Sequence, residues 1–249
     1  MTSHTRGAFI SHSSLLILSA AALWALDGIL RRSLYHLPAI TIISIEHWIG
    51  ALLIAIFCWN SLKKIHLNRT SLVLIAGVAL FSGILGTLFF TQALLATQFI
   101  PFSVVFLLQK LEPLFAILFG WIVLKETLPK HFMPWAALAL GAAFFVTFPL
   151  GSVNLNTGDG TMIAALFALG AALLWGSSTA FSRRLTLMHG AVNATALRFI
   201  ATALFAPFFI IGMGHVSSLA TVTGMDIVIL LTIALSTGMV ALFLYYKGL

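Results

Sequence analysis

The sequence has few of the residues on which soluble enzymes and disulfide-rich domains depend. Its single cysteine, Cys58, lies inside an apolar run, so the chain can build neither a disulfide framework nor a thiolate metal site. Only 8% of the 249 residues are charged, and six of these are acidic. With 61% hydrophobic residues and a mean hydropathy of +1.10, the composition excludes a soluble domain and indicates a polytopic membrane protein.

Motifs of membrane proteases and of ATP-driven pumps are also absent. The chain contains no H-E-x-x-H, G-x-G-D or G-x-S-G, and no G-x-x-x-x-G-K-[ST] for binding nucleoside triphosphates. We therefore expect no enzyme activity, no cofactor and no metal site. The net charge of +7 comes mostly from basic residues in short gaps between apolar runs, which favours orientation signals over nucleic-acid binding.

Eight apolar runs are long enough to cross a bilayer, which needs about 20 residues per helix. They cover residues 14–32, 39–62, 71–96, 101–124, 132–150, 160–182, 191–212 and 225–247. The gaps between them are too short to hold a soluble domain. The sequence therefore predicts an all-α protein with eight transmembrane helices.

The distribution of lysine and arginine predicts the orientation. With the N-terminus in the cytoplasm, nine basic residues fall on the cytoplasmic side: Arg6, Lys63, Lys64, Arg69, Lys125, Lys130, Arg183, Arg184 and Lys247. Only Arg31 and Arg32 fall outside, while Lys110 and Arg198 lie within spans. This bias agrees with the positive-inside rule and predicts a cytoplasmic N-terminus. The pair at 31 and 32 is an exception.

The chain contains two similar halves. The segment "AAALW" ending at Trp24 resembles "AALLW" ending at Trp175, and the same offset relates His47 to Arg198. Further along, "ALFSG" at 79–83 resembles "ALSTG" at 234–238. If the unit has five spans, an odd number, the second copy enters the membrane from the opposite side. Such inverted repeats are typical of secondary transporters.

The second repeat stops early by this comparison. Its last residue, Leu249, corresponds to Leu94 at the end of the third span of the first repeat. We therefore expect residues 1–150 to be a five-helix repeat and residues 151–249 to be a second repeat that is truncated after its third helix. The whole would be a ten-helix protein of five plus five spans.

These features resemble one known family. The duplicated five-helix units, "ALW" and "LLW" in the first span of each half, and "LEPLFAILFGWIVLKETL" with Pro113 and Glu126 resemble the EamA-type permeases of the drug/metabolite transporter superfamily. The resemblance implies a ten-helix inner-membrane carrier for small metabolites, amino acids or drugs, working by alternating access. It does not name a substrate.

The stretch "QKLEP" places two charges and a helix breaker near the middle of the fourth span. Lys110 and Glu112 would each cost about 2.5–3.5 kcal/mol at the bilayer centre. Pro113 lacks an amide hydrogen, so it frees the carbonyl of Gln109 and kinks the helix. Such backbone is tolerated where it lines a cavity, which predicts a substrate or coupling-ion site here. The structural alternative is that Lys110 pairs with an acid on a neighbouring helix.

Two acids in neighbouring spans are candidate partners for Lys110. Glu46 in the second span is deeper in the membrane than Asp27 in the first, so Glu46 is the preferred counter-ion. Asp27 could line the same pathway, or it could form a local surface pair with Arg31 one turn away.

Aromatic and basic residues complete the predicted pathway. Trp24 and Trp175 occupy equivalent repeat positions and could flank a central route or serve in packing alone. Arg198 could hold an anionic group or anchor its helix to backbone carbonyls. Tyr245 and Tyr246 at the end of the last span are expected to form an interfacial anchor.

The predicted function is transport of a small polar or amphipathic metabolite, amino acid or drug across the cytoplasmic membrane by alternating access. Acids and bases together at the midplane favour a zwitterionic or nucleoside-like solute. The alternative is a channel or a lipid-translocating protein, although duplicated halves favour a carrier. The expected partners are the small-molecule substrate, the lipid bilayer and a second copy of the chain in a homodimer, with no nucleic acid.

Overall fold

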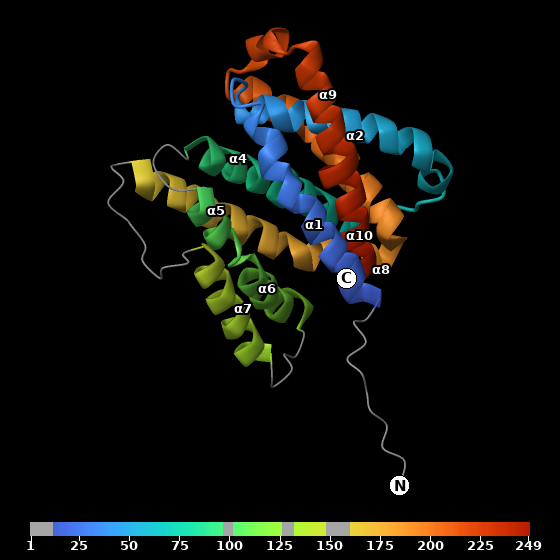
Figure 1. Cartoon of the computed structure of the whole chain (residues 1–249). Helices are drawn as coiled ribbons and strands as arrows, with labels where there is room; N and C mark the ends of the chain where they lie inside the picture. Colours follow the sequence, from blue (N-terminus) through green and yellow to red (C-terminus); the bar gives the residue numbers. More distant parts are fainter. Residues whose placement is uncertain (1–11, 97–101, 126–131, 148–159) are drawn as a thin grey trace.

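A computed structural model describes residues 12–96, 102–125, 132–147 and 160–249, and every element in these ranges is helical (Figure 1). The elements are α1 (His12–Arg32), α2 (Ala39–Leu62), α3 (Arg69–Val78), the π-helix η1 (Ala79–Gly86), α4 (Thr87–Leu95), α5 (Phe102–Gln109), α6 (Glu112–Leu124), α7 (Phe132–Thr147), α8 (Gly160–Gly212), the 3-10 helix η3 (Val216–Thr221), α9 (Gly224–Ile233), the π-helix η4 (Ala234–Val240) and α10 (Ala241–Gly248).

These helices coincide with the eight predicted runs. Among the described residues, six continuous helical stretches are long and apolar enough to cross a membrane, and α7 contributes a shorter apolar helix. The stretch from 163 to 212 is 50 residues long and contains two spans, since its backbone breaks at Gly190. The prediction of an all-α polytopic membrane protein is confirmed.

Gly190 makes the sharp turn between the sixth and seventh spans. Its φ of 78° and ψ of 159° lie in a region that residues with a Cβ rarely adopt, and no atom would contact an added Cβ. The helix of the sixth span therefore continues past residue 182, where the predicted apolar run ends, as far as Gly190. Arg183 and Arg184 lie inside the helix, because a basic pair near a membrane surface can extend a helix beyond the hydrocarbon layer.

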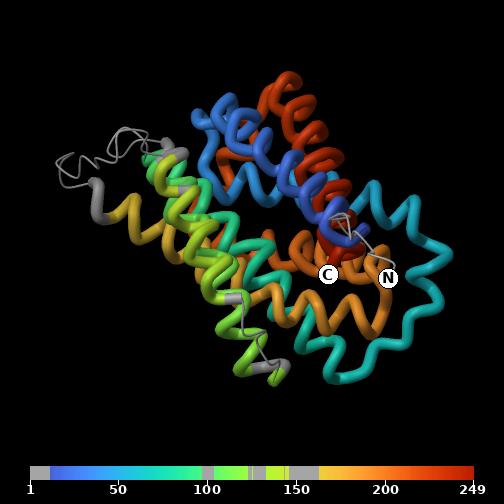
Figure 2. The backbone as a smooth tube through the Cα atoms, turned by 60° about the horizontal axis from the view of Figure 1, so that its bottom comes forward, coloured from blue at the N-terminus to red at the C-terminus, as the bar shows by residue number. Residues whose placement is uncertain are grey.

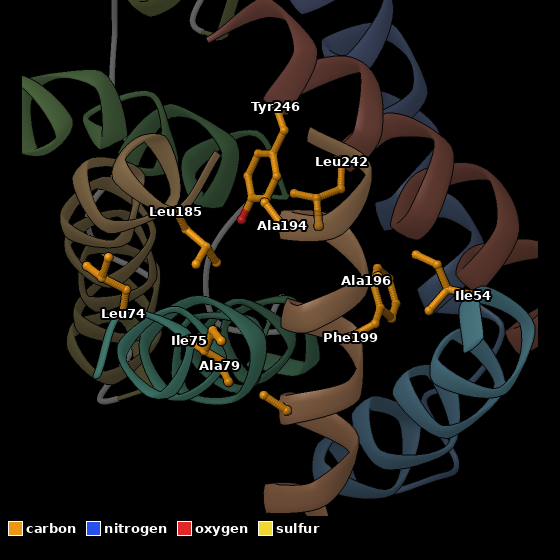
Figure 3. Packing of buried hydrophobic residues seen from close by; sticks show 11 residues of the cluster. Ile54, Leu74, Ile75, Ala79, Leu185, Ala194, Ala196, Phe199, Leu242 and Tyr246 are labelled. Atoms are coloured by element: carbon orange, nitrogen blue, oxygen red, sulfur yellow. The ribbon is translucent and has the colours of Figure 1, made fainter. Parts of the chain in front are cut away.

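The principal apolar core lies between the two halves of the chain. Ile54 from α2 and Ile75 from α3 pack in one buried cluster with Phe199 from α8 and Leu242 from α10 (Figure 3). Large apolar side chains are exposed on the outer surface, for example Phe57 at 78%. An apolar exterior is the surface that lipid requires.

Tyr246 belongs to this core and is only 1% exposed. Its hydroxyl donates to Ser182 Oγ at 2.8 Å, and Figure 3 shows its ring pointing into the cluster. The predicted interfacial anchor is therefore wrong for Tyr246. A tyrosine at a helix end is buried when the neighbouring helix supplies an acceptor for its hydroxyl.

The helices form two groups along α8. α1 and α10 lie side by side, while α5 and α6 (green) lie against the first half of α8 and α7 (yellow-green) packs on α5 (Figures 1 and 2). α6 approaches α8 closely at Gly176. A Cβ added there would lie 2.6 Å from both the Glu112 carbonyl oxygen and the Phe115 Cβ. Glycine therefore allows the broken fourth span to contact α8 directly.

Gly176→Ala is expected to destabilise the protein by about 1–3 kcal/mol, the usual range for overpacking. The atoms in the way belong mainly to the α6 backbone, so the two helices must move apart. Thermal unfolding of detergent-purified protein measures the effect. The matched control is Gly141→Ala in α7, where nothing lies within 4 Å of the added carbon. An equal melting temperature for the two variants would contradict the proposed close packing.

Candidate functional site

The fourth span is broken at the position of its charged residues. α5 ends at Gln109 and α6 begins at Glu112, so Lys110 and Leu111 form a turn. Pro113 lies in the first turn of α6, where a missing amide hydrogen breaks no helical bond. The Glu112 carboxylate is thus at the positive end of a helix, which favours its negative charge. Lys110 is exposed and Glu112 is half-buried.

A buried ion-pair network joins the first two spans to the last one. Arg31 Nε donates to Asp27 Oδ2 at 2.5 Å, and Arg31 Nη2 donates to Glu46 Oε2 at 2.7 Å. The Arg31 side chain is 3% exposed. The Thr237 hydroxyl in η4 donates to the second oxygen of Asp27 at 2.7 Å. One guanidinium therefore holds two carboxylates, and the network carries a formal charge of −1.

This network corrects two predictions. Glu46 is not the counter-ion of Lys110, because Arg31 on the adjacent α1 occupies its carboxylate. The pair between Asp27 and Arg31 forms as the sequence allowed, but inside the protein instead of at its surface. Arg31 is therefore a buried residue of α1 and does not count as a charge in the loop after it. Of the two arginines that depart from the positive-inside bias, only Arg32 is exposed.

The two tryptophans make equivalent contacts across the repeat. Trp24 Nε1 donates to the Thr237 carbonyl in η4 at 2.9 Å, and Trp175 Nε1 donates to the Ser82 carbonyl in η1 at 3.2 Å. Ser82 and Thr237 occupy equivalent positions in "ALFSG" and "ALSTG". Each tryptophan thus bonds the π-helix of the other half. π-helices are uncommon and are frequent at functional sites.

Arg198 lies in the second half of α8, between the acids of two different spans. It is within electrostatic range of Glu46 and of Glu112. Its Nε is buried and has no hydrogen-bond partner among the described residues. A buried donor without a partner is costly, so such groups call for an explanation such as a ligand. The sequence also allowed Arg198 to anchor its helix by donating to backbone carbonyls. Its Nε makes no such bond among the described residues.

Aromatic rings border the same region. The rings of Trp24 and Tyr245 lie 5.2 Å apart, and the Tyr245 hydroxyl shares a hydrogen bond with Thr179 Oγ1 at 3.3 Å. Tyr245 is within electrostatic range of both Glu112 and Arg198. Trp175 packs on Phe90, with centroids 5.1 Å apart, in a second apolar cluster. The arrangement offers a guanidinium, carboxylates and flat apolar surfaces to a small molecule.

Sequence reasoning did not assign Arg31, Thr237 or Tyr245 to the site. The spacing of Asp27 and Arg31 indicated their pairing, but no local signal showed that a third group, Glu46, would join them. Glu126 lies outside the described residues. Among the described residues, no group of three or more histidine, cysteine, aspartate or glutamate side chains could hold a metal ion.

Comparisons with known proteins give a consistent result. Residues 12–148 match the EamA-like transporter family. The riboflavin transporter ImpX of Fusobacterium nucleatum is 35% identical over 206 residues, which are 82% of this chain and 67% of that protein. A solved crystal structure superposes with a TM-score of 0.68 at 18% identity, covering 95% of this chain and 78% of the other. That likeness shows the shared fold.

Proposed function

This chain belongs to the EamA-like transporter family, and we propose that it is a carrier for a flat heteroaromatic metabolite, with riboflavin as the first candidate. It is a multi-pass membrane protein and a small-molecule permease. The substrate class rests on the relative that is a riboflavin transporter and on the side chains that surround Arg198.

The observation that carries the proposal is the unpartnered Nε of Arg198. Riboflavin combines a planar ring that bears carbonyl oxygens with a polyhydroxyl chain. A guanidinium can donate to the ring carbonyls, and the Glu112 carboxylate can accept from the hydroxyls. Trp24 and Tyr245 offer surfaces for stacking at the same place. Of the two solute classes that the sequence favoured, zwitterionic and nucleoside-like, this proposal retains the second, since riboflavin is uncharged.

Alternating access is supported by the internal equivalence of the two halves. The contacts of the tryptophans with η1 and η4 relate the first and third spans of each half, at the offsets of the sequence repeat, 175 − 24 = 151 for the tryptophans and 237 − 82 = 155 for the π-helices. We propose that these halves are inverted repeats of a five-plus-five fold and that the carrier rocks about the site between them. A channel would not need this duplication. Catalysis is not part of the proposal.

The proposed orientation places the N-terminus and the turn between α2 and α3 in the cytoplasm of a cell with an inner membrane. Lys63, Lys64 and Arg69 lie at that turn, whereas the turn between α1 and α2 exposes only Arg32 among the basic residues near it. The expected homodimer remains a prediction.

Uptake of labelled riboflavin by riboflavin-auxotrophic cells tests the function. Cells that produce the protein should accumulate the label with saturable kinetics, and preloaded vesicles should show counterflow, which a channel would not. An excess of unlabelled riboflavin should compete, and an excess of a neutral amino acid should not. Uptake equal to that of cells with an empty vector, or competition by the amino acid alone, would contradict the riboflavin assignment.

A further inference from the structure

Two polar contacts tie turns of one half of the chain to turns of the other. In the first, His36 Nε2 lies 3.1 Å from Asp226 Oδ2, and the hydroxyls of Thr41 and Ser218 share a hydrogen bond at 2.5 Å. We call these four residues the His36 clamp. They join the turn between α1 and α2 to the segment that leads into α9.

The second contact joins the end of α2 and the start of α3 to the Gly190 turn. His189 Nε2 lies 2.8 Å from Ser71 Oγ, and the Ser61 hydroxyl donates to Asn193 Oδ1 at 2.7 Å. We call these four residues the His189 clamp. A hollow of about 540 Å³ lies over it and is lined by Ser61, His189 and Asn193 among others, so water reaches this contact.

The two clamps are built on the same local motif. Asn68 caps α3 by accepting the Ser71 amide at 2.8 Å, and Thr223 caps α9 by accepting the Asp226 amide at 3.3 Å. The offset between these two caps equals the offset between the two π-helices. In each clamp, a histidine near the end of the first span of one half meets the residue of the other half whose amide is capped three residues after the N-cap.

The clamps lie at opposite ends of α2. Thr41 is in its first turn and Ser61 in its last turn, which places them about 30 Å apart at 1.5 Å per residue. This distance is the thickness of the hydrocarbon core. Figure 1 shows the α1–α2 turn and the α2–α3 turn at opposite ends of this helix. Glu46 lies between Thr41 and Ser61 on α2 and is within electrostatic range of Arg198, so one clamp lies on each side of this level of the helix.

We propose that the His36 clamp is the outer gate of the carrier, that the His189 clamp is its inner gate, and that protons outside the cell close the outer gate alone. The proposal rests on the proposed carrier function. It follows from one difference between the clamps: the acceptor facing His36 is a carboxylate, whereas the group facing His189 is a hydroxyl.

Protonation acts through the contact with Asp226. Histidine gains a proton between about pH 5 and 8, and a protonated His36 forms an ion pair with Asp226 only while the gate is closed. The neighbouring elements contribute Arg32 from α1, Tyr35 from the turn and His215 before η3. Arg32 is exposed and therefore screened by water, whereas the Asp226 side chain is 5% exposed, so attraction to Asp226 dominates. Acid thus favours the closed state.

Cross-linking of cysteine pairs measures each gate without any substrate. In a Cys58→Ser background, Thr41→Cys with Ser218→Cys reports the outer gate, and Ser61→Cys with Asn193→Cys reports the inner gate. Thiols react faster as the pH rises in both pairs, so dividing the outer rate by the inner rate removes this effect. The ratio of outer to inner cross-linking rate should rise roughly two- to fivefold between pH 8 and pH 5.5, the size of a partly exposed ion pair.

His36→Gln keeps a hydrogen bond but cannot be charged, so it should make this ratio independent of pH, whereas His189→Gln should leave the rise unchanged. A rise that survives in His36→Gln, or no rise in the parent, would overturn the gate.

If a cysteine pair prevents folding, the pH profile of uptake gives the same comparison. Uptake should fall two- to fivefold on acidification in the parent and in His189→Gln, but not in His36→Gln. Riboflavin uptake that occurs without this profile would refute the gate and leave the carrier function standing.

Discussion

Arg31→Met is expected to remove most of the folded protein. The substitution leaves Asp27 and Glu46 buried without their shared cation, and breaking a buried ion pair costs about 3–5 kcal/mol. That amount is a large fraction of the stability of a typical protein. The yield of monodisperse protein after detergent extraction measures the loss directly.

Two further variants separate charge imbalance from lost packing. Arg32→Met changes the adjacent exposed arginine and should leave the yield unchanged. Adding Asp27→Asn and Glu46→Gln to Arg31→Met removes the stranded charges and should restore much of the folded protein. Wild-type yield for Arg31→Met, or no recovery in the triple variant, would show that the network does not hold the first two spans together.

Arg198→Gln is expected to lower riboflavin uptake by roughly 10- to 150-fold while the protein stays folded. A hydrogen bond to a charged group contributes about 1.5–3 kcal/mol, which corresponds to that range. Folding should survive because the buried Nε has no partner to lose and Glu46 keeps its bond to Arg31. Initial uptake rates and the extracted yield should be measured on the same cells.

The matched control is Arg184→Gln, which removes an exposed arginine from the part of α8 that precedes the Gly190 turn. It should change neither uptake nor yield. If Arg198→Gln transported riboflavin at the normal rate, the site assignment would be wrong. If instead uptake and yield fell together, Arg198 would be a structural residue, as one reading of the sequence allowed.

The break in the fourth span is a feature that local chemistry alone predicts. Pro113 cannot donate a backbone bond, and its ring excludes the preceding helical geometry, so a break near Gln109 followed from the sequence alone. The spans also followed, because lipid demands continuous apolar runs with internally bonded backbone. The sequence also predicts a repeat, and Trp24 and Trp175 make corresponding hydrogen bonds with η4 and η1.

The partners of the charged residues were decided only by the tertiary structure. Composition and spacing identified Glu46, Arg31 and Arg198 as unusual, but the nearest opposite charge is set by how α1, α2 and α8 pack. Glu46 pairs with Arg31 because α1 places the guanidinium 2.7 Å from its carboxylate. The burial of Tyr246 was fixed in the same way by Ser182 on α8. Helices and spans depend on neighbours in sequence, whereas ion pairs and buried hydroxyls depend on distances between residues that are far apart along the chain.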